Sequence, residues 1–138
     1  MTDTPVELVR RLYAEVLDEG RFELLDELAD AGFVAHGGPR GEQRGVAALA
    51  VPATAIRNAF ADLHFELHDL FGDGDRVAVR WTMHGRQVAP FFGLEPPSPA
   101  PTGATPFSRA TVIFRVAGGR LVEQWSANER IQPAPVAA

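Results

Sequence analysis

The sequence predicts an α+β domain in which helices come first and an antiparallel sheet follows. Apolar residues recur at helical spacing before His64, whereas residues 64–87 alternate between apolar and polar with the period of a β-strand. A second alternating pair covers Phe107–Val116 and Arg120–Asn128. We expect a curved sheet wrapped around the N-terminal helices, with an internal cavity of the kind that usually holds a small ligand.

Two helices are expected at the start of the chain. Thr4 can cap the first helix, Pro5 suits its first position, and Glu7 follows three residues after the cap. Apolar residues continue at helical spacing to Leu17, and Gly20 ends the pattern. Residues 22–28 form a second, short helix by the same criterion.

The next segments change conformation several times. Asp30–Gly32 ends the second helix, and Phe33–His36 is expected to be a short extended segment. Residues 37–45 form a polar, glycine-rich loop, and Val46–Leu63 favours helix again. Because proline lacks a backbone donor, Pro52 predicts a kink there or a division into two short helices.

Residues 64–87 form two long strands joined by a tight turn at Gly72–Asp75, whose residues tolerate positive φ. One face of the first strand carries Phe65, Leu67, Asp69 and Phe71, and the same face of the second carries Val77, Val79, Trp81 and Met83. A two-stranded ribbon is marginal alone, so we expect other elements to cover this face.

The rest of the chain holds a loop, two strands and a tail. Residues 90–106 contain six of the 11 prolines and are expected to be an extended, unpaired loop. The last two strands follow around Ala117–Gly119, and residues 132–138 are expected to be disordered. Residues 1–131 then form a single domain, as the length of 138 residues suggests.

Composition excludes several functions. The net charge of −5 leaves no basic stripe for nucleic acid or for an anionic membrane. The absence of cysteine excludes disulfides, thiolate metal sites and cysteine nucleophiles. No apolar run is long enough to span a membrane and no leader opens the chain, so we expect a cytoplasmic protein.

Several motifs together resemble one family. They are Phe33–His36, Asp75–Thr82, Gly93 with Pro101–Gly103, Ile113–Arg115 and Gly118–Trp125. In these residues the chain is similar to the SnoaL-like polyketide cyclase family of the nuclear transport factor 2-like superfamily. The resemblance extends from about Pro5 to Glu129. Its motifs are specific for the fold and much less so for the reaction, because this scaffold hosts several chemistries.

The resemblance implies acid/base catalysis of an intramolecular aldol-type ring closure, without metal or cofactor. Family members commonly have a histidine at the position of Val112 and the general acid/base aspartate at that of Ser126. Where family members usually have an acidic residue this chain has Ala35, and where they have a further histidine it has Gln87. The fold signature is therefore kept while the family's acid/base pair is replaced.

His36 is the main candidate for proton transfer, because a histidine can act as a general base near neutral pH. Gln124, Ser126 and Asn128 share one face of the last strand. The resemblance places position 126 in the pocket, so this face is expected to offer hydroxyl and amide groups that orient a carbonyl or hold an enolate oxygen. We expect all four side chains to point into one cavity, with His36, Ser126 and Asn128 catalytic.

Other residues are candidates for substrate binding. They are Tyr13 and Gln87 near the rim, Trp81 in the wall, Phe91 in a proline-rich lid, and Val112 and Gln124 beside the catalytic set. A structural role is the preferred alternative for Tyr13, and core or interface packing for Trp81. A loop packed on a partner subunit is an equal alternative to a lid that carries Phe91. Asp69 is a second base candidate if it faces inward, with a salt bridge to an arginine as the preferred alternative.

His64, His68 and His84 are assigned to the outer sheet face and to no metal site. The same face, with Arg80 and Thr82, is expected to form a homodimer interface, as the resemblance also implies.

The functional expectation is a cofactor-free cyclase or isomerase that acts on a hydrophobic, polyketide-like or related secondary metabolite. Two alternatives stay open: a non-catalytic domain that binds a small molecule, and an epoxide-opening hydrolase. The missing acid/base pair favours the binding domain.

Overall fold

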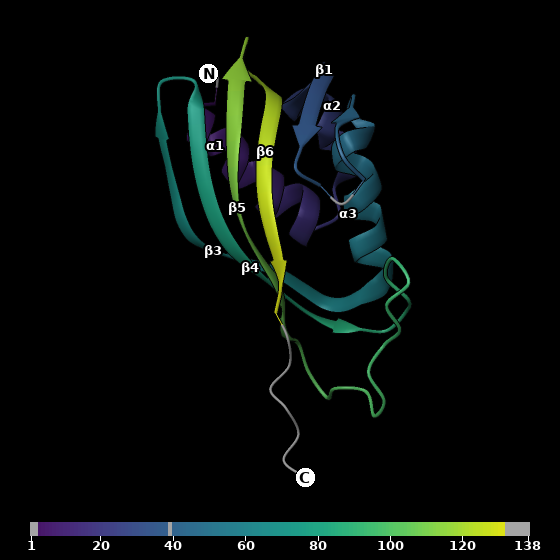
Figure 1. Ribbon diagram of the computed structural model, residues 1–138. Coiled ribbons are helices and arrows are strands. Elements are labelled where there is room, and N and C mark those ends of the chain that lie inside the picture. Colours follow the sequence, from purple (N-terminus) through teal and green to yellow (C-terminus); the bar gives the residue numbers. More distant parts are fainter. Residues whose placement is uncertain (1–2, 39, 132–138) are drawn as a thin grey trace.

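The computed structural model of the protein describes residues 3–38 and 40–131, so the predicted disordered tail at 132–138 lies outside the described residues. Helices and a curved sheet form two layers (Figure 1). The elements are α1 (Pro5–Arg11), the π-helical η1 (Leu12–Asp18), the 3₁₀-helical η2 (Phe22–Leu24), α2 (Leu25–Leu28), β1 (Ala29–His36), β2 (Gln43–Arg44), α3 (Ala47–Ala59), β3 (Phe60–Asp73), β4 (Arg76–Gln87), β5 (Thr105–Ala117) and β6 (Arg120–Arg130).

The first helical segment starts as its sequence predicts. The Thr4 hydroxyl accepts a hydrogen bond from the backbone N–H of Glu7 at 3.2 Å, and Pro5 occupies the first turn. After Arg11 the chain continues into the wider π-helical turns of η1, which the apolar spacing did not predict. Such turns often occur at functional sites.

Three predicted boundaries are corrected by strand pairing. β1 begins at Ala29 rather than Phe33, because Ala29 already pairs with Leu121 of β6. α3 ends at Ala59 rather than Leu63, and Pro52 lies inside one helix instead of separating two. Phe60 instead begins β3, opposite Gln87 of β4. The long partner strand outweighs the local helical preference of residues 60–63.

The six strands form one sheet in the order β2-β1-β6-β5-β4-β3. The sheet is mixed rather than purely antiparallel, because β1 runs parallel to β6. The register of β3 shifts between Leu67 and Asp69, which moves Asp69 and Phe71 to the outer face. Asp69 forms the predicted alternative salt bridge, with Arg80 at 2.7 Å.

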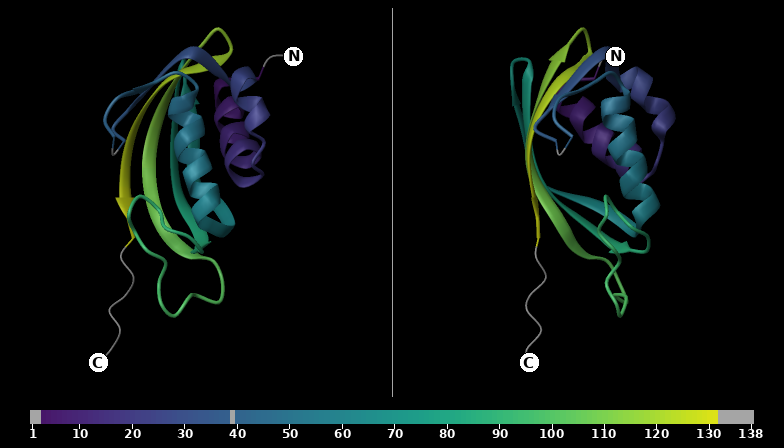
Figure 2. Two further views of the ribbon diagram at one scale, coloured as in Figure 1. Left: turned by 90° about the vertical axis from the view of Figure 1, so that its right-hand side faces the viewer. Right: turned by 45° about the vertical axis from the view of Figure 1, so that its right-hand side comes forward.

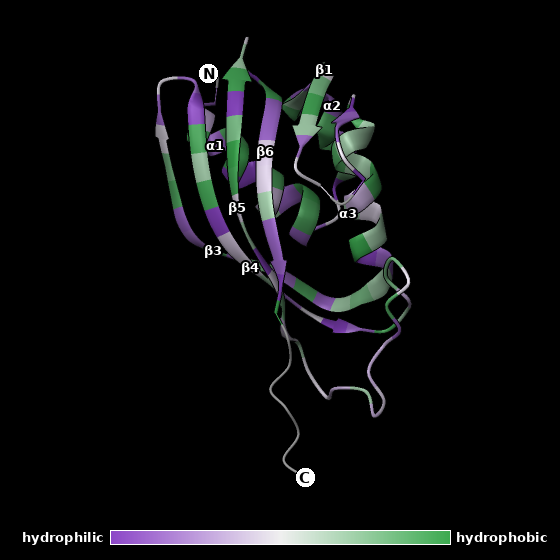
Figure 3. Ribbon diagram, in the orientation of Figure 1, coloured by the Kyte–Doolittle hydropathy of each residue, from purple (hydrophilic) through white to green (hydrophobic). Residues whose placement is uncertain are grey.

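The helices cover one face of the curved sheet and leave the other uncovered (Figure 2). Hydrophobic and hydrophilic residues follow one another along β4 and β5 (Figure 3). The inward set packs against the helices in the core, with Phe33, Val77 and Phe114 fully buried. Within the described residues, no helix is long and apolar enough to cross a membrane.

Replacing Trp81 by alanine should lower the free energy of unfolding by about 3 kcal/mol, the lower end of the usual cost of removing a buried aromatic side chain. The side chain is 9% exposed and packs edge-on against Phe65 with ring centroids 4.8 Å apart. Phe71→Ala is the matched control, because Phe71 is 63% exposed, and should cost no more than about 0.5 kcal/mol. Urea denaturation measures both. Equal losses would show that the face assignment is wrong.

Candidate functional site

A cavity of about 600 Å³ lies between the helices and the inner face of the sheet. Its walls are mainly apolar and aromatic, with Leu12 and Ile56 on the helix side and Phe65 and Met83 on the sheet side. Apolar walls with a few polar groups are typical of a site for a hydrophobic small molecule. The cavity is the strongest candidate for the functional site.

The strand register arranges the floor of the cavity in rows. Trp81 lies opposite Ala110, which in turn lies opposite Asn128. The next row joins Val79, Val112 and Ser126. Ala110 is buried between Trp81 and Asn128, which both line the cavity. A ligand can therefore lie between the tryptophan and the last strand.

Gln124, Ser126 and Asn128 form a polar but uncharged part of the β6 wall, and all three face the cavity. The Ser126 hydroxyl lies 3.4 Å from the main-chain carbonyl of His36, which is too long for a strong hydrogen bond. Among the described residues, neither amide side chain has a hydrogen-bond partner. All three groups are therefore available to a bound molecule.

Tyr13 lies at the bottom of the cavity, not at its rim. Its hydroxyl oxygen accepts a hydrogen bond from the indole N–H of Trp81 at 3.0 Å. Burial raises the pKa of Tyr13 above its ordinary value, so the phenol stays protonated at working pH. Because the indole can only donate, the phenolic proton is left to donate to another acceptor. The side chain borders the cavity, where a ligand oxygen can be that acceptor.

His36 lies on the opposite face of the sheet from this wall. Its ring stacks on Trp125, with centroids 5.5 Å apart, and its Nε2 lies 2.7 Å from a carboxylate oxygen of Glu123. This contact, followed by that of Arg115, lowers the pKa of Glu123. The reason is strand parity: His36 pairs with Trp125, and both point away from the helices. The structure therefore does not bring His36 to Gln124, Ser126 and Asn128.

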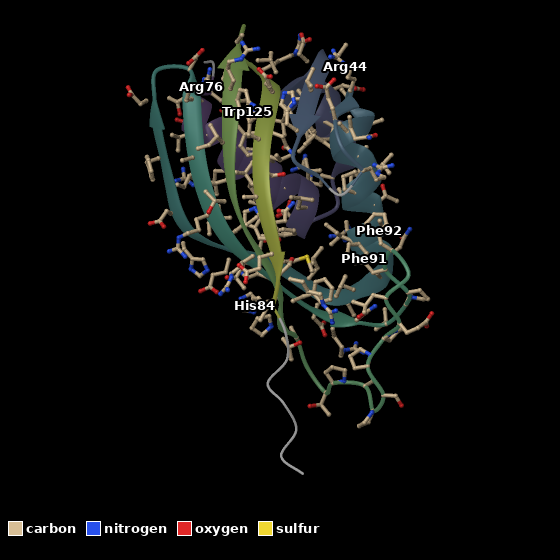
Figure 4. The ribbon with its side chains drawn as sticks, in the orientation of Figure 1. Arg44, Arg76, His84, Phe91, Phe92 and Trp125 are labelled. Atoms are coloured by element: carbon tan, nitrogen blue, oxygen red, sulfur yellow. The ribbon has the colours of Figure 1, made fainter. Side chains whose placement is uncertain are left out.

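Gln87 is buried and supports the proline-rich loop rather than the cavity. Its side-chain amide donates to the carbonyl oxygens of Ala89 and Leu94, at 3.1 and 2.9 Å. The loop segment that it holds carries Phe91 and Phe92, which border the cavity beside α3 (Figure 4). The sequence-predicted residues that the structure does gather around the cavity are Tyr13, Trp81, Phe91, Val112, Gln124, Ser126 and Asn128.

His68 and His84 lie on the outer face, as expected, whereas His64 lies on the edge strand β3 and its ring reaches a residue of η1. His64 contacts Asp18, His68 contacts Thr82, and His84 contacts Glu66 at 2.9 Å. Within residues 3–38 and 40–131, no three histidine, aspartate or glutamate side chains are grouped so that they could hold a metal ion.

Sequence reasoning missed several residues of the cavity. Ser108 and Arg130 line it from paired positions on β5 and β6. The alternation that joins Gln124, Ser126 and Asn128 continues to Arg130, so the signal was present in the sequence. Among the described residues that line the cavity, Glu129 is the one that carries a carboxylate; by strand parity it points to the outer face, and it borders the cavity at its edge. Two hydrogen bonds from Arg109, at 2.9 and 3.3 Å, lower the pKa of Glu129. A lowered pKa makes Glu129 a weak base.

Comparison with known proteins gives one consistent picture. The family model for SnoaL-like polyketide cyclases matches residues 7–134. No curated protein matches the sequence. Two similar solved structures are IdmH, a candidate polyketide cyclase from Streptomyces antibioticus (TM-score 0.73, 26% identity, 92% of this chain and 93% of that one covered), and TsrD from Streptomyces laurentii (TM-score 0.75, 23% identity, 94% and 92% covered). A third is a candidate SnoaL-like polyketide cyclase from Jannaschia sp. CCS1 (TM-score 0.75, 22% identity, 91% and 85% covered), and at this identity the likeness concerns the fold alone.

Replacing Gly37 by alanine should disturb the cavity wall next to Ser126. Gly37 has a φ of +88°, and an added Cβ would overlap the carbonyl oxygen of Ser126. We expect a loss of at least about 2 kcal/mol in the free energy of unfolding. Gly38→Ala is the control, because nothing lies within 4 Å of the Cβ that it would add. Denaturation curves compare the two, and a Gly37→Ala protein as stable as the wild type would contradict this local geometry.

Proposed function

Because the chain belongs to the SnoaL-like polyketide cyclase family, we propose that it is a cofactor-independent enzyme that closes a ring in, or isomerises, a hydrophobic polyketide-like or related secondary metabolite. The volume and aromatic lining of the cavity suit a flat, hydrophobic substrate. The hydrogen-bonding groups are few and gathered at the floor and on one wall, which suits a substrate with several carbonyl oxygens.

The hydrogen bond between Trp81 and Tyr13 is the observation that supports this function most directly. A phenol that accepts one hydrogen bond is polarised and becomes a better donor through its own proton. Directed into a cavity with apolar walls, that proton can stabilise negative charge on a substrate oxygen, as donors in an oxyanion hole do. The hydrogen bond is stronger there than in water because the surroundings are less polar.

An intramolecular aldol closure needs no reagent besides the substrate. The carbon of an enol attacks a carbonyl carbon, the new carbon–carbon bond forms, and the attacked oxygen becomes negative. The enol oxygen loses its proton, and the attacked oxygen gains one. Tyr13 is positioned to donate a hydrogen bond to the oxygen that becomes negative, while the amides of Gln124 and Asn128 and the Ser126 hydroxyl orient the other oxygens.

The cavity would act mainly by holding the substrate in a folded, reactive conformation. Ser126 stands where a carboxylate would take the proton in other members, and the lining carboxylate of Glu129 is paired with Arg109. Orientation alone can lower the barrier of an intramolecular reaction substantially. A substrate that enolises readily, with the enol proton passing between its own oxygens or through water, fits such a site.

A non-catalytic binding domain is the second candidate. The observation that favours it is that Gln124, Ser126 and Asn128 on β6 include no strong base. Such a protein would bind the cyclised and the open form with similar affinity. An enzyme would accelerate their interconversion.

Tyr13→Phe should lower the turnover number about 10²- to 10³-fold, the usual cost of removing one donor from an oxyanion hole. The substitution removes the hydroxyl and keeps the ring that packs against Phe65. Product formation from a poly-β-ketone substrate, followed by chromatography, is the measurement.

His36→Ala is the control for this prediction, because His36 lies on the other face of the sheet. It should retain turnover within about threefold. Full activity in Tyr13→Phe would remove the proposed role of the hydroxyl. Equal rates with and without protein would favour the binding domain.

We further infer a homodimer formed across the outer sheet face. This face has no helix over it (Figure 2) and carries paired charges, such as Arg109 with Glu129 and Arg80 with Asp69, around a hollow of about 530 Å³. Trp125 and the guanidinium of Arg76, 4.9 Å from its ring centroid, lie on the same face (Figure 4). A large aromatic side chain beside an arginine is typical of the centre of an interface.

Light scattering should give twice the chain mass of 14.9 kDa at micromolar concentration. Trp125→Glu should shift the protein to monomers, because it places a carboxylate in the buried centre of the interface. The exposed loop substitution Phe92→Glu should leave the dimer intact. A wild-type mass of one chain would contradict the inference.

A further inference from the structure

Among the described residues that line the cavity, Arg130 is the one that carries a positive charge. It lies on the inward parity of β6, two residues after Asn128, and is paired with Ser108 of β5. The next residue donates its backbone N–H to the carbonyl of Phe107 at 2.8 Å, so the ladder holds the end of β6 in place. The backbone of Arg130 is therefore fixed, although its side chain is exposed.

Phe107 also positions the guanidinium of Arg130. The Cζ atom lies 5.4 Å from the centroid of this ring, and the ring in turn packs edge-on against Phe60 and Phe91. This cation–π contact holds the guanidinium over the ring and uses none of its N–H donors. Within the described part of the chain, Arg130 forms neither an ion pair nor a side-chain hydrogen bond.

The nearby negative charge is already compensated. Glu129 also borders the cavity, but both of its carboxylate oxygens accept hydrogen bonds from Arg109. The Cα atoms of Asn128 and Arg130 are about 6.6 Å apart, at about 3.3 Å per residue along a strand. The cavity thus combines the neutral hydrogen-bonding groups of Gln124, Ser126 and Asn128 with one uncompensated positive charge a short distance toward the end of β6.

We propose that Arg130 selects substrates that carry a carboxylate, so that the aromatic body lies over Trp81 and the carboxylate lies at the guanidinium. Arginine matches a carboxylate with two parallel hydrogen bonds, which gives orientation as well as affinity. The carboxylate would fix which end of the molecule reaches Tyr13. This inference rests on the proposed function, because it takes the cavity as the substrate site.

The test compares two probes with the same aromatic body, anthracene-2-carboxylate and anthracene-2-carboxamide. Binding to the full-length protein is followed by the fluorescence anisotropy of the anthracene ring at low salt. The wild type should bind the carboxylate about tenfold more tightly than the amide, as expected for hydrogen bonds to a charged group. Arg130→Gln should remove this preference and leave the Kd of the amide within about twofold.

Two further variants separate the effect of the planar guanidinium, which can donate two parallel hydrogen bonds, from the effect of its charge alone. Arg130→Lys should keep only part of the preference, because an ammonium is a point charge without the planar fork. Arg120→Gln should keep all of it, since Arg120 is an exposed arginine at the other end of β6 that forms no ion pair among the described residues. In the wild type the preference should shrink at high salt, which screens exposed charges.

Three results would overturn the proposal. Equal affinity of the wild type for the two probes would mean that Arg130 is a solvent-exposed arginine only, while the cavity remains a binding site. A preference that survives in Arg130→Gln would assign charge selection to another group. If neither probe binds, the cavity does not accept a flat aromatic body, and the proposed function fails together with this inference. Because the assay measures binding without turnover, loss of catalysis alone does not affect it.

Discussion

Val112 lies opposite Ser126 in the ladder between β5 and β6, and this register determines which side chains can meet a ligand. Leu121 points inward at the start of β6, but an irregularity between Arg115 and Val116 changes the parity, so that Gln124, Ser126 and Asn128 point inward after it. A slip by one residue would exchange the two faces and place Glu123 and Trp125 in the cavity. The neutral side chains of Gln124, Ser126 and Asn128 thus face the cavity because of one irregular position in the sheet.

A few polar contacts also fix the helices relative to one another and to the sheet. Arg57 of α3 donates to the carbonyl oxygens of Leu17 and Asp18, both at 2.8 Å, and so satisfies the carbonyl end of η1. The carboxylate of Asp18 accepts the backbone N–H of Phe65 in β3 at 2.9 Å. Trp81 completes the set by donating to Tyr13. The contacts of Arg57 join two helices of one layer, and those of Asp18 and Trp81 join the helices to the sheet.

Local pattern predicted most of the fold, because the helix start at Thr4, the ribbon and the last strand pair each depend on spacing within one segment. It failed where a distant strand decides the outcome. The inward parity expected for Asp69 was lost at the bulge in β3. The inward orientation expected for His36 was wrong. The face to which His36 points is set by its parallel pairing with Trp125 of β6, which lies 89 residues further along the chain. The polar wall was predictable, since Gln124, Ser126 and Asn128 lie on one unbroken strand.

The most direct test of this account is a nuclear magnetic resonance titration with a flat aromatic ligand such as anthracene-2-carboxamide. The account predicts that the side-chain amide signals of Gln124 and Asn128 shift as the ligand binds, because both groups face the cavity. The ring signals of His36 should stay in place, because its ring is stacked on Trp125 on the other face. Shifts in His36 with unchanged amide signals would show that the ligand binds the outer face, and would contradict the assignment of the site.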